Sequence, residues 1–243
     1  MNYNTSVLKN DEKAVLELRS LYSKYGYGQY KMSKFEEYDL YVRNKEFLVS
    51  DQVITFTDTN GKLMALKPDV TLSIIRNTTE TEGCVQKVYY NENVYRVSKG
   101  TDSFKEIMQT GLECIGDIDD YNIYEVLMLA AESLRTVSED FVLDISHMGI
   151  IESVLDSVSV PSEAKNSLVK CIGEKNAHEI RAICAGYNVD SDSLVKLVTS
   201  YGKPSEVIEV LRGILPENAD VDSLDKITRA LEKHGYADRK SVV

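Results

Sequence analysis

The spacing of apolar residues changes along the chain near residue 146. Beyond that point they recur three and four positions apart, the period of an amphipathic helix, and strand-like alternation nearly disappears. Proline and glycine residues separate the periodic segments, which favours helix ends there. The pattern predicts six helices, at residues 147–157, 161–171, 175–184, 191–201, 204–214 and 222–234. We therefore expect residues 147–243 to form a mainly helical domain.

The first 146 residues mix helical and strand patterns. Asn60-Gly61 between two apolar runs is a hairpin signal, and Pro68 suits the first turn of a helix because its missing N–H costs little there. The predicted helices are 11–24, 69–77 and 121–137, and the predicted strands are 45–57, 62–66, 94–98, 104–115 and 142–145. We expect residues 1–146 to form an α+β domain with a mainly antiparallel sheet and flanking helices.

The predicted strand 104–115 has a polar face. Alternation places Phe104, Met108, Leu112 and Cys114 on one side and Lys105, Gln109, Gly111 and Glu113 on the other. We expect the first side to pack and the second to be open to a ligand. Gln109 and Glu113 would stand about 13 Å apart with side-chain-free Gly111 between them. The alternative is an antiparallel strand with one ordinary solvated face.

Composition limits the classes of partner. The chain has 243 residues, 43% of them hydrophobic, and a net charge of −11 that repels nucleic-acid phosphates. Its cysteines form no Cys-x-x-Cys pair, and it has neither a signal-type N-terminal run nor an apolar run of about 18 residues, so we expect a cytoplasmic protein with reduced thiols and no membrane span. The histidines (His147, His178 and His234) show no metal-ligand spacing, and we expect no metal site.

Fixed spacings on the predicted 94–116 hairpin form a motif. Glu106, Gln109, Gly111, Glu113 and Gly116 follow the pattern Glu-x-x-Gln-x-Gly-x-Glu-x-x-Gly, and Arg96 stands on the preceding strand. These residues resemble motif 2 of class II aminoacyl-tRNA synthetases, most closely that of histidyl-tRNA synthetase and its relatives.

Three further blocks resemble the same group. Residues 66–76 resemble its Leu-Arg-Pro-Glu-x-Thr segment, residues 146–151 its Gly-His-x-Gly stretch, and Tyr25-Gly26-Tyr27 with Phe35-Glu36 its motif 1. The resemblance implies a class II synthetase-like α+β fold in which residues 147–243 correspond to the family's helical insertion.

The chain also departs from the synthetases. Ser98 stands where they carry a glutamate that helps read the adenine of ATP, and the loop at 99–103 carries Asp102 instead of an arginine-rich sequence. The chain stops at Val243, about where the next core strand would begin, so we expect the histidine segment and motif 3 to be absent. The departures imply a protein without adenylating activity, tRNA binding or a cofactor.

The resemblance also implies a histidine-like pocket. A bound histidine needs an acid for its ammonium, a cationic or amide donor for its carboxylate and an acceptor for its ring. Asp69 and Thr71 would meet the α-amino end, Arg96 and Gln109 the carboxylate, and Glu113 would orient the ammonium or the ring. Two alternatives are a helix-start cap for Asp69 and Thr71, and a salt bridge from Arg96 to Glu106 or Glu113.

Among these relatives, the resemblance favours the regulatory subunits of ATP phosphoribosyltransferase, non-catalytic proteins of histidine biosynthesis. It implies the catalytic phosphoribosyltransferase subunit as partner, histidine as effector, and a homodimer through residues 25–41. A truncated histidyl-tRNA synthetase and a domain that binds another amino acid are the alternatives.

Overall fold

The computed structural model describes residues 7–43, 53–78, 83–98 and 101–236. The chain divides into two compact units, which we name the sheet unit (residues 1–122) and the helical unit (residues 123–243). The domain boundary near residue 146, which we predict from the change in apolar spacing, stays a prediction beside this division.

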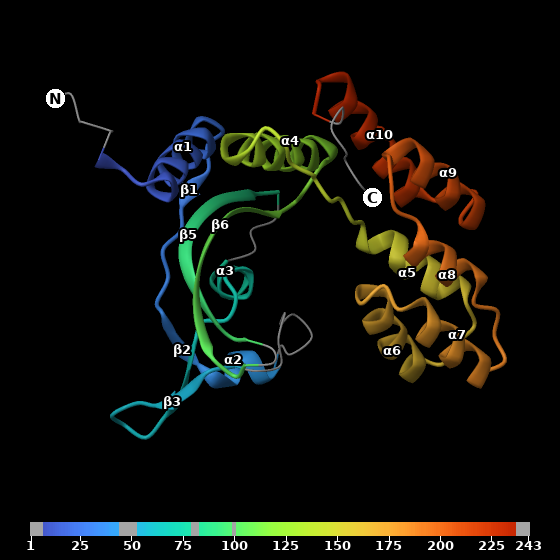
Figure 1. Cartoon of the computed structure of the whole chain (residues 1–243), viewed down its shortest axis with the longest axis horizontal. Coiled ribbons are helices and arrows are strands. Elements are labelled where there is room, and N and C mark those ends of the chain that lie inside the picture. The colour runs from blue at the N-terminus through green and yellow to red at the C-terminus, as the bar shows by residue number, and fades with distance from the viewer. Residues whose placement is uncertain (1–6, 44–52, 79–82, 99–100, 237–243) are drawn as a thin grey trace. The chain divides into compact units, whose positions relative to one another are not determined.

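The sheet unit combines helices with two three-stranded sheets (Figure 1). Its elements are α1 (Asn10–Lys24), β1 (Gly28–Gln29), β2 (Phe35–Glu37), α2 (Tyr38–Arg43), β3 (Thr55–Thr57), β4 (Leu63–Leu66), α3 (Thr71–Asn77), β5 (Val85–Val97) and β6 (Phe104–Gly116). One sheet has the order β1-β5-β6 and the other β2-β4-β3, and every pairing except the parallel β1–β5 pair is antiparallel. This confirms the predicted α+β class and the antiparallel character of the sheet.

The β3–β4 hairpin forms around the predicted Asn60-Gly61 turn. Asp58 Oδ1 accepts hydrogen bonds from the backbone N–H groups of Asn60 and Lys62, both at 2.8 Å. Gly61 has a φ of +80°, the left-handed region that this turn position requires. Residues 45–52 of the strand predicted at 45–57 lie outside the described residues.

The β5–β6 hairpin is the longest paired element of the described residues and is strongly curved (Figure 1). Its register runs from Val97 opposite Phe104 to Val85 opposite Gly116. The register is unbroken, so side chains alternate along β6, and Lys105, Gln109, Gly111 and Glu113 share one face, as predicted. Their cross-strand partners on β5 point to the same side.

Helix α3 packs on that face. The apolar cluster there joins Val70 and Ile74 to Val88, Tyr90 and Val94 of β5. On the opposite face, Phe104 is 73% exposed and Met108 48% exposed. The prediction that the Phe104 side packs and the Gln109 side lies open was therefore wrong for these residues, because α3 supplies the apolar partner of the polar strand face.

The helical unit contains the helices predicted after residue 146, preceded by one that starts in the sheet unit. They are α4 (Asp120–Val137), α5 (Met148–Ser157), α6 (Ser162–Gly173), α7 (Ala177–Gly186), α8 (Asp192–Thr199), α9 (Pro204–Ile214) and α10 (Ala219–Lys233). The strand predicted at 142–145 was wrong, since only Asp144 forms a single bridge there. Leu143 and Ile145 are buried without a ladder of strand hydrogen bonds.

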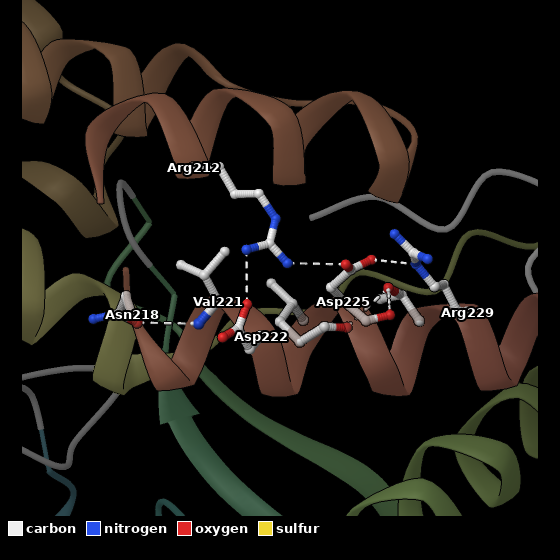
Figure 2. Close-up of polar contacts among 8 residues, drawn as sticks. Arg212, Asn218, Val221, Asp222, Asp225 and Arg229 are labelled. Carbon is white, nitrogen blue, oxygen red and sulfur yellow. Dashed lines mark hydrogen bonds and ion pairs between the residues drawn. The ribbon is translucent and has the colours of Figure 1, made fainter. Parts of the chain in front are cut away.

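Ion pairs join α9 to α10 (Figure 2). Arg212 on α9 donates to Asp222 at 2.7 Å and to Asp225 at 3.0 Å, and within α10 Arg229 donates to Asp225 at 2.7 Å. Asn218 begins α10 by accepting from the backbone N–H of Val221 at 3.0 Å, a capping contact that satisfies a free helix donor. In the described part of the chain, no helix is both long and apolar enough for a membrane span.

Candidate functional site

Glu113 is the central carboxylate of the predicted pocket. It projects from β6 toward the first turn of α3, where the Thr71 hydroxyl donates to its Oε1 at 2.6 Å. Burial raises the pKa of Glu113, and the charge of Asp69 raises it further, while the Thr71 hydrogen bond acts in the opposite direction. The structure therefore brings together three of the predicted residues around a carboxylate whose ionised form is disfavoured.

Gln109 contacts Tyr90, whose hydroxyl lies close enough to Glu113 to be affected by its charge. The sequence pattern did not indicate Tyr90. Gln109 Nε2 donates to the Tyr90 hydroxyl at 3.1 Å, and burial together with the charge of Glu113 raises the pKa of Tyr90 to about 12. Tyr90 is the cross-strand partner of Gly111, and a Cβ on Gly111 would lie 2.5 Å from the Tyr90 hydroxyl. The prediction that Gly111 leaves a gap for a ligand was wrong, because the Tyr90 ring occupies it.

Asp69 lies at the start of α3. Its Oδ1 accepts from the backbone N–H of Leu72 at 3.1 Å, so Asp69 makes the capping contact of the alternative interpretation. Thr71 makes its contact with Glu113 instead. The helix-start cap considered for both residues therefore applies to Asp69 alone, whereas Thr71 faces the hairpin.

Arg96 contacts the chain next to Asp69 but lies away from Glu113 along the hairpin. Its register partner is Lys105, whereas Glu113 pairs with Val88, eight positions earlier on β5. Arg96 Nε donates to the Pro68 carbonyl at 3.1 Å. Glu106 accepts instead from Asn93 at 2.6 Å and Tyr95 at 2.9 Å, so the salt bridge considered between Arg96 and Glu106 does not form.

Buried polar contacts around α3 extend the site beyond the predicted residues. Ser73 and Tyr41 both donate to the carboxylate of Glu36. The Lys67 ammonium, fully buried, pairs with Glu92 at 2.9 Å. These partners lie 25 or more positions apart except for Tyr41 and Glu36, and no spacing in a single sequence indicates which of them meet.

The arrangement suits the binding of a small cationic or zwitterionic group. Glu113 and Asp69 repel each other, and among the described residues neither has a cation within ion-pair distance. An ammonium between them would relieve the repulsion and donate hydrogen bonds to carboxylates that are already oriented by Thr71 and by the Leu72 N–H. The described residues contain no cluster of His, Cys, Asp and Glu side chains that could hold a metal ion.

Comparison with known proteins gives the chain relatives of two kinds. Residues 4–242 match the family described as histidyl-tRNA synthetase. An ATP phosphoribosyltransferase regulatory subunit from Oceanobacillus iheyensis is 27% identical over 207 residues, which cover 83% of this chain and 51% of the relative. Other curated relatives are named as histidine–tRNA ligases. The chain spans only about half the length of the curated relatives that it matches. It covers 51% of the Oceanobacillus regulatory subunit and 58% of another regulatory subunit, from Alkaliphilus metalliredigens.

Solved structures share the fold. A Bacillus halodurans structure described as an ATP phosphoribosyltransferase regulatory subunit/histidyl-tRNA synthetase matches with a TM-score of 0.77 at 20% identity, over 99% of this chain and 68% of that one. The ATP phosphoribosyl transferase (HisG:HisZ) complex from Thermotoga maritima matches with a TM-score of 0.70 at 19% identity, over 95% of this chain and 79% of that one. The predicted class II synthetase-like fold is confirmed.

Proposed function

We propose a regulatory function for this chain, which belongs to the histidyl-tRNA synthetase family. In this proposal it is a non-catalytic subunit of ATP phosphoribosyltransferase that binds the catalytic subunit and senses histidine. The name of the Oceanobacillus relative and the composition of the Thermotoga complex support the regulatory role and the partner.

The contact between Thr71 and Glu113 carries the proposal for histidine. It orients a carboxylate beside Asp69, and burial together with the charge of Asp69 raises the pKa of Glu113, which forms no ion pair with a cation of the described residues. The histidine ammonium would supply a cation. Gln109 and Arg96 are the proposed donors to the histidine carboxylate. Histidine would act by binding one state of the complex with the catalytic subunit more tightly than another.

Calorimetric titration of histidine tests the pocket. Glu113→Gln and Gln109→Ala should weaken binding more than Arg96→Ala, because Arg96 already donates to the Pro68 carbonyl and lies far from Glu113 along the hairpin. Loss of a charged partner from a desolvated site costs roughly 3 kcal/mol, about two orders of magnitude in Kd. Glu106→Gln is the matched control, since Glu106 lies on the other face of the same strand.

Equal histidine affinity in wild type and Glu113→Gln would overturn this pocket. Titrating the same proteins with other amino acids tests the remaining alternative, a site for a different amino acid. Tighter binding of another amino acid, lost in Glu113→Gln, would keep the pocket and change its ligand.

The proposal also excludes adenylation. Ser98, in place of the synthetase glutamate, closes the hairpin loop by donating its backbone N–H to the Ser103 carbonyl at 2.9 Å and offers no carboxylate for an adenine. We expect no histidine-dependent exchange of pyrophosphate with ATP and no charging of tRNA. Measurable exchange would favour the runner-up function, a fragment of a histidyl-tRNA synthetase.

Assembly gives a further test. We propose a homodimer contact within residues 25–41, where Phe35 is 52% exposed and its ring meets that of Phe56 edge-on at 5.4 Å. Exposed aromatic rings in contact are typical of interfaces. Light scattering should give the mass of a dimer, and Phe35→Ser should shift the particle toward the monomer. Adding the catalytic subunit should give a larger particle that contains both proteins. A monomer across a wide concentration range would contradict the homodimer.

A further inference from the structure

The helical unit contains a cavity of about 340 Å³ that the proposed function does not use. Its walls are formed by apolar side chains of α5, α6, α8 and α9, among them Ile150, Ile172, Leu197, Val198, Val207 and Leu211. This volume lies at the lower end of the range of about 300–1,000 Å³ that is typical of small-molecule pockets. The walls therefore fit a small ligand with an apolar body.

The polar groups that line the cavity include His147 and Lys175, and one of them is buried without a partner among the described residues. His147 Nδ1 is buried and has no hydrogen-bond partner among the described residues. The Lys175 ammonium lies 4.7 Å from the centroid of the Tyr201 ring, and within the described residues it forms no ion pair. Lys175 is exposed at the edge of the cavity, so its ammonium can reach both solvent and a ligand. The buried nitrogen without a partner points to a ligand with a polar group, and the nearby cation favours an anionic one.

The backbone at Lys175 gives an independent reason to assign its side chain a role. Lys175 has a φ of +52°, a left-handed conformation that favours glycine. It follows the last turn of α6, where its N–H donates to the Ile172 carbonyl at 3.0 Å and the N–H of Asn176 donates to the Cys171 carbonyl at 2.9 Å. This pair of bonds is the Schellman motif.

The same pair of bonds ends three other helices of the chain. The residue in the left-handed position is Gly26 after α1, Asn188 after α7 and Gly235 after α10. Glycine and asparagine are the residues that tolerate this conformation best, and a lysine side chain gains nothing from it. Lysine thus occupies a position that local backbone energetics would assign to glycine, at the edge of a cavity.

We propose that this cavity binds a small monocarboxylic acid with an apolar body. Lys175 takes the carboxylate, with His147 as a second polar contact, and the isoleucine, leucine and valine walls take the apolar body. Asp144 also lines the cavity and repels a second negative charge, so the ligand carries a single carboxylate.

Titration calorimetry with sodium octanoate as the probe tests the proposal on the full chain. Wild type should bind one equivalent. Lys175→Gly should weaken binding at least tenfold, the equivalent of one charge-assisted hydrogen bond, while its melting temperature stays unchanged or rises because glycine relieves the left-handed backbone. Asn188→Gly is the matched control: it makes the same change at the same helix-end motif away from the cavity lining, and its octanoate affinity should equal that of wild type.

Two further probes separate the carboxylate from the apolar body. Octanamide, which keeps the chain length but lacks the charge, should bind at least tenfold more weakly than octanoate, and acetate should not bind measurably. Val198→Phe, which fills the cavity, should abolish octanoate binding in a protein that keeps its wild-type circular dichroism spectrum. No octanoate binding by wild type, equal affinity in Lys175→Gly, or equal affinity for octanamide would each overturn the proposal.

Discussion

Glu113 of the sheet unit and Asp225 of the helical unit are both partly buried carboxylates, yet their surroundings have opposite effects. Burial and the charge of Asp69 raise the pKa of Glu113, whose partner is the Thr71 hydroxyl. Burial also acts to raise the pKa of Asp225, but hydrogen bonds from Arg229 and Arg212 outweigh it and leave that pKa lowered.

The difference distinguishes a carboxylate that stabilises the fold from one suited to a ligand. Asp225 has its positive charge within the chain, on α9 and α10, and its contacts account for its position (Figure 2). Glu113 is oriented by a hydroxyl without being neutralised, which is the condition for binding an external ammonium. Composition alone treats the two residues as equivalent, and only their partners separate them.

The largest expected effect tests whether the partner of a carboxylate, and not the unit in which it lies, decides if that carboxylate stabilises the fold. Glu92 belongs to the sheet unit, like Glu113, but pairs with the fully buried Lys67. Glu92→Gln should lower the free energy of unfolding by ~3–5 kcal/mol because it leaves a buried ammonium without its counter-charge. Urea unfolding followed by circular dichroism measures the loss.

Glu106→Gln provides the control for that substitution. Glu106 lies on the same hairpin, accepts hydrogen bonds from Asn93 and Tyr95, and is exposed. Its replacement should cost less than ~1 kcal/mol. A Glu92→Gln protein no less stable than Glu106→Gln would mean that the Lys67 pair does not stabilise the sheet unit.

A smaller effect compares Asp225 and Glu113 directly. Asp225→Asn should lower the free energy of unfolding by ~1–2 kcal/mol, because it weakens hydrogen bonds from two arginines. Glu113→Gln should leave the free energy unchanged or raise it slightly, since the amide oxygen still accepts from Thr71 and the repulsion from Asp69 disappears. Asp222→Asn, at a 64% exposed side chain with one arginine contact, is the control and should cost less than Asp225→Asn.

The prediction depends on which of Asp225→Asn and Glu113→Gln lowers the free energy of unfolding more. A greater loss of stability in Glu113→Gln than in Asp225→Asn would show that the Glu113 carboxylate is a structural group. The binding site would then have to lie elsewhere in the sheet unit.

The helices and the hairpin were predictable because their signals are local. Apolar residues spaced three and four apart indicated each helix from α5 to α10 within a few residues. The segment 142–145 misled the same reasoning, since Leu143 and Ile145 alternate like a strand but are buried without one. A short apolar stretch carries no information about whether a neighbouring strand is present.

The placement of the candidate residues on the strand was predictable, but their contacts were not. Gln109 and Glu113 were correctly placed on one face because alternation is intrinsic to a strand. Tyr90 was missed, although the hairpin register pairs it with Gly111 and could have been counted back from the loop. The partner of Lys67 could not be found in this way, because Glu92 is 25 positions away and only the tertiary fold brings them together.

The smallest expected effect is a difference in pH dependence. Because the pKa of Asp225 is lowered by folding, its stabilising contribution is complete above the usual value of 3.8 and is lost as the pH falls through the lower pKa of the folded state. Because the pKa of Glu113 is raised, its contribution is complete below the usual value of 4.5 and is lost as the pH rises through the higher pKa of the folded state.

The two variants should therefore flatten opposite sides of the stability profile. Asp225→Asn should remove part of the loss on the acidic side, whereas Glu113→Gln should remove part of the loss that wild type shows as the pH rises from 4.5 toward neutrality. Urea midpoints measured by circular dichroism at closely spaced pH values give both profiles. If Glu113→Gln leaves the profile above pH 4.5 unchanged, Glu113 titrates like a solvated carboxylate, and the contrast with Asp225 does not hold.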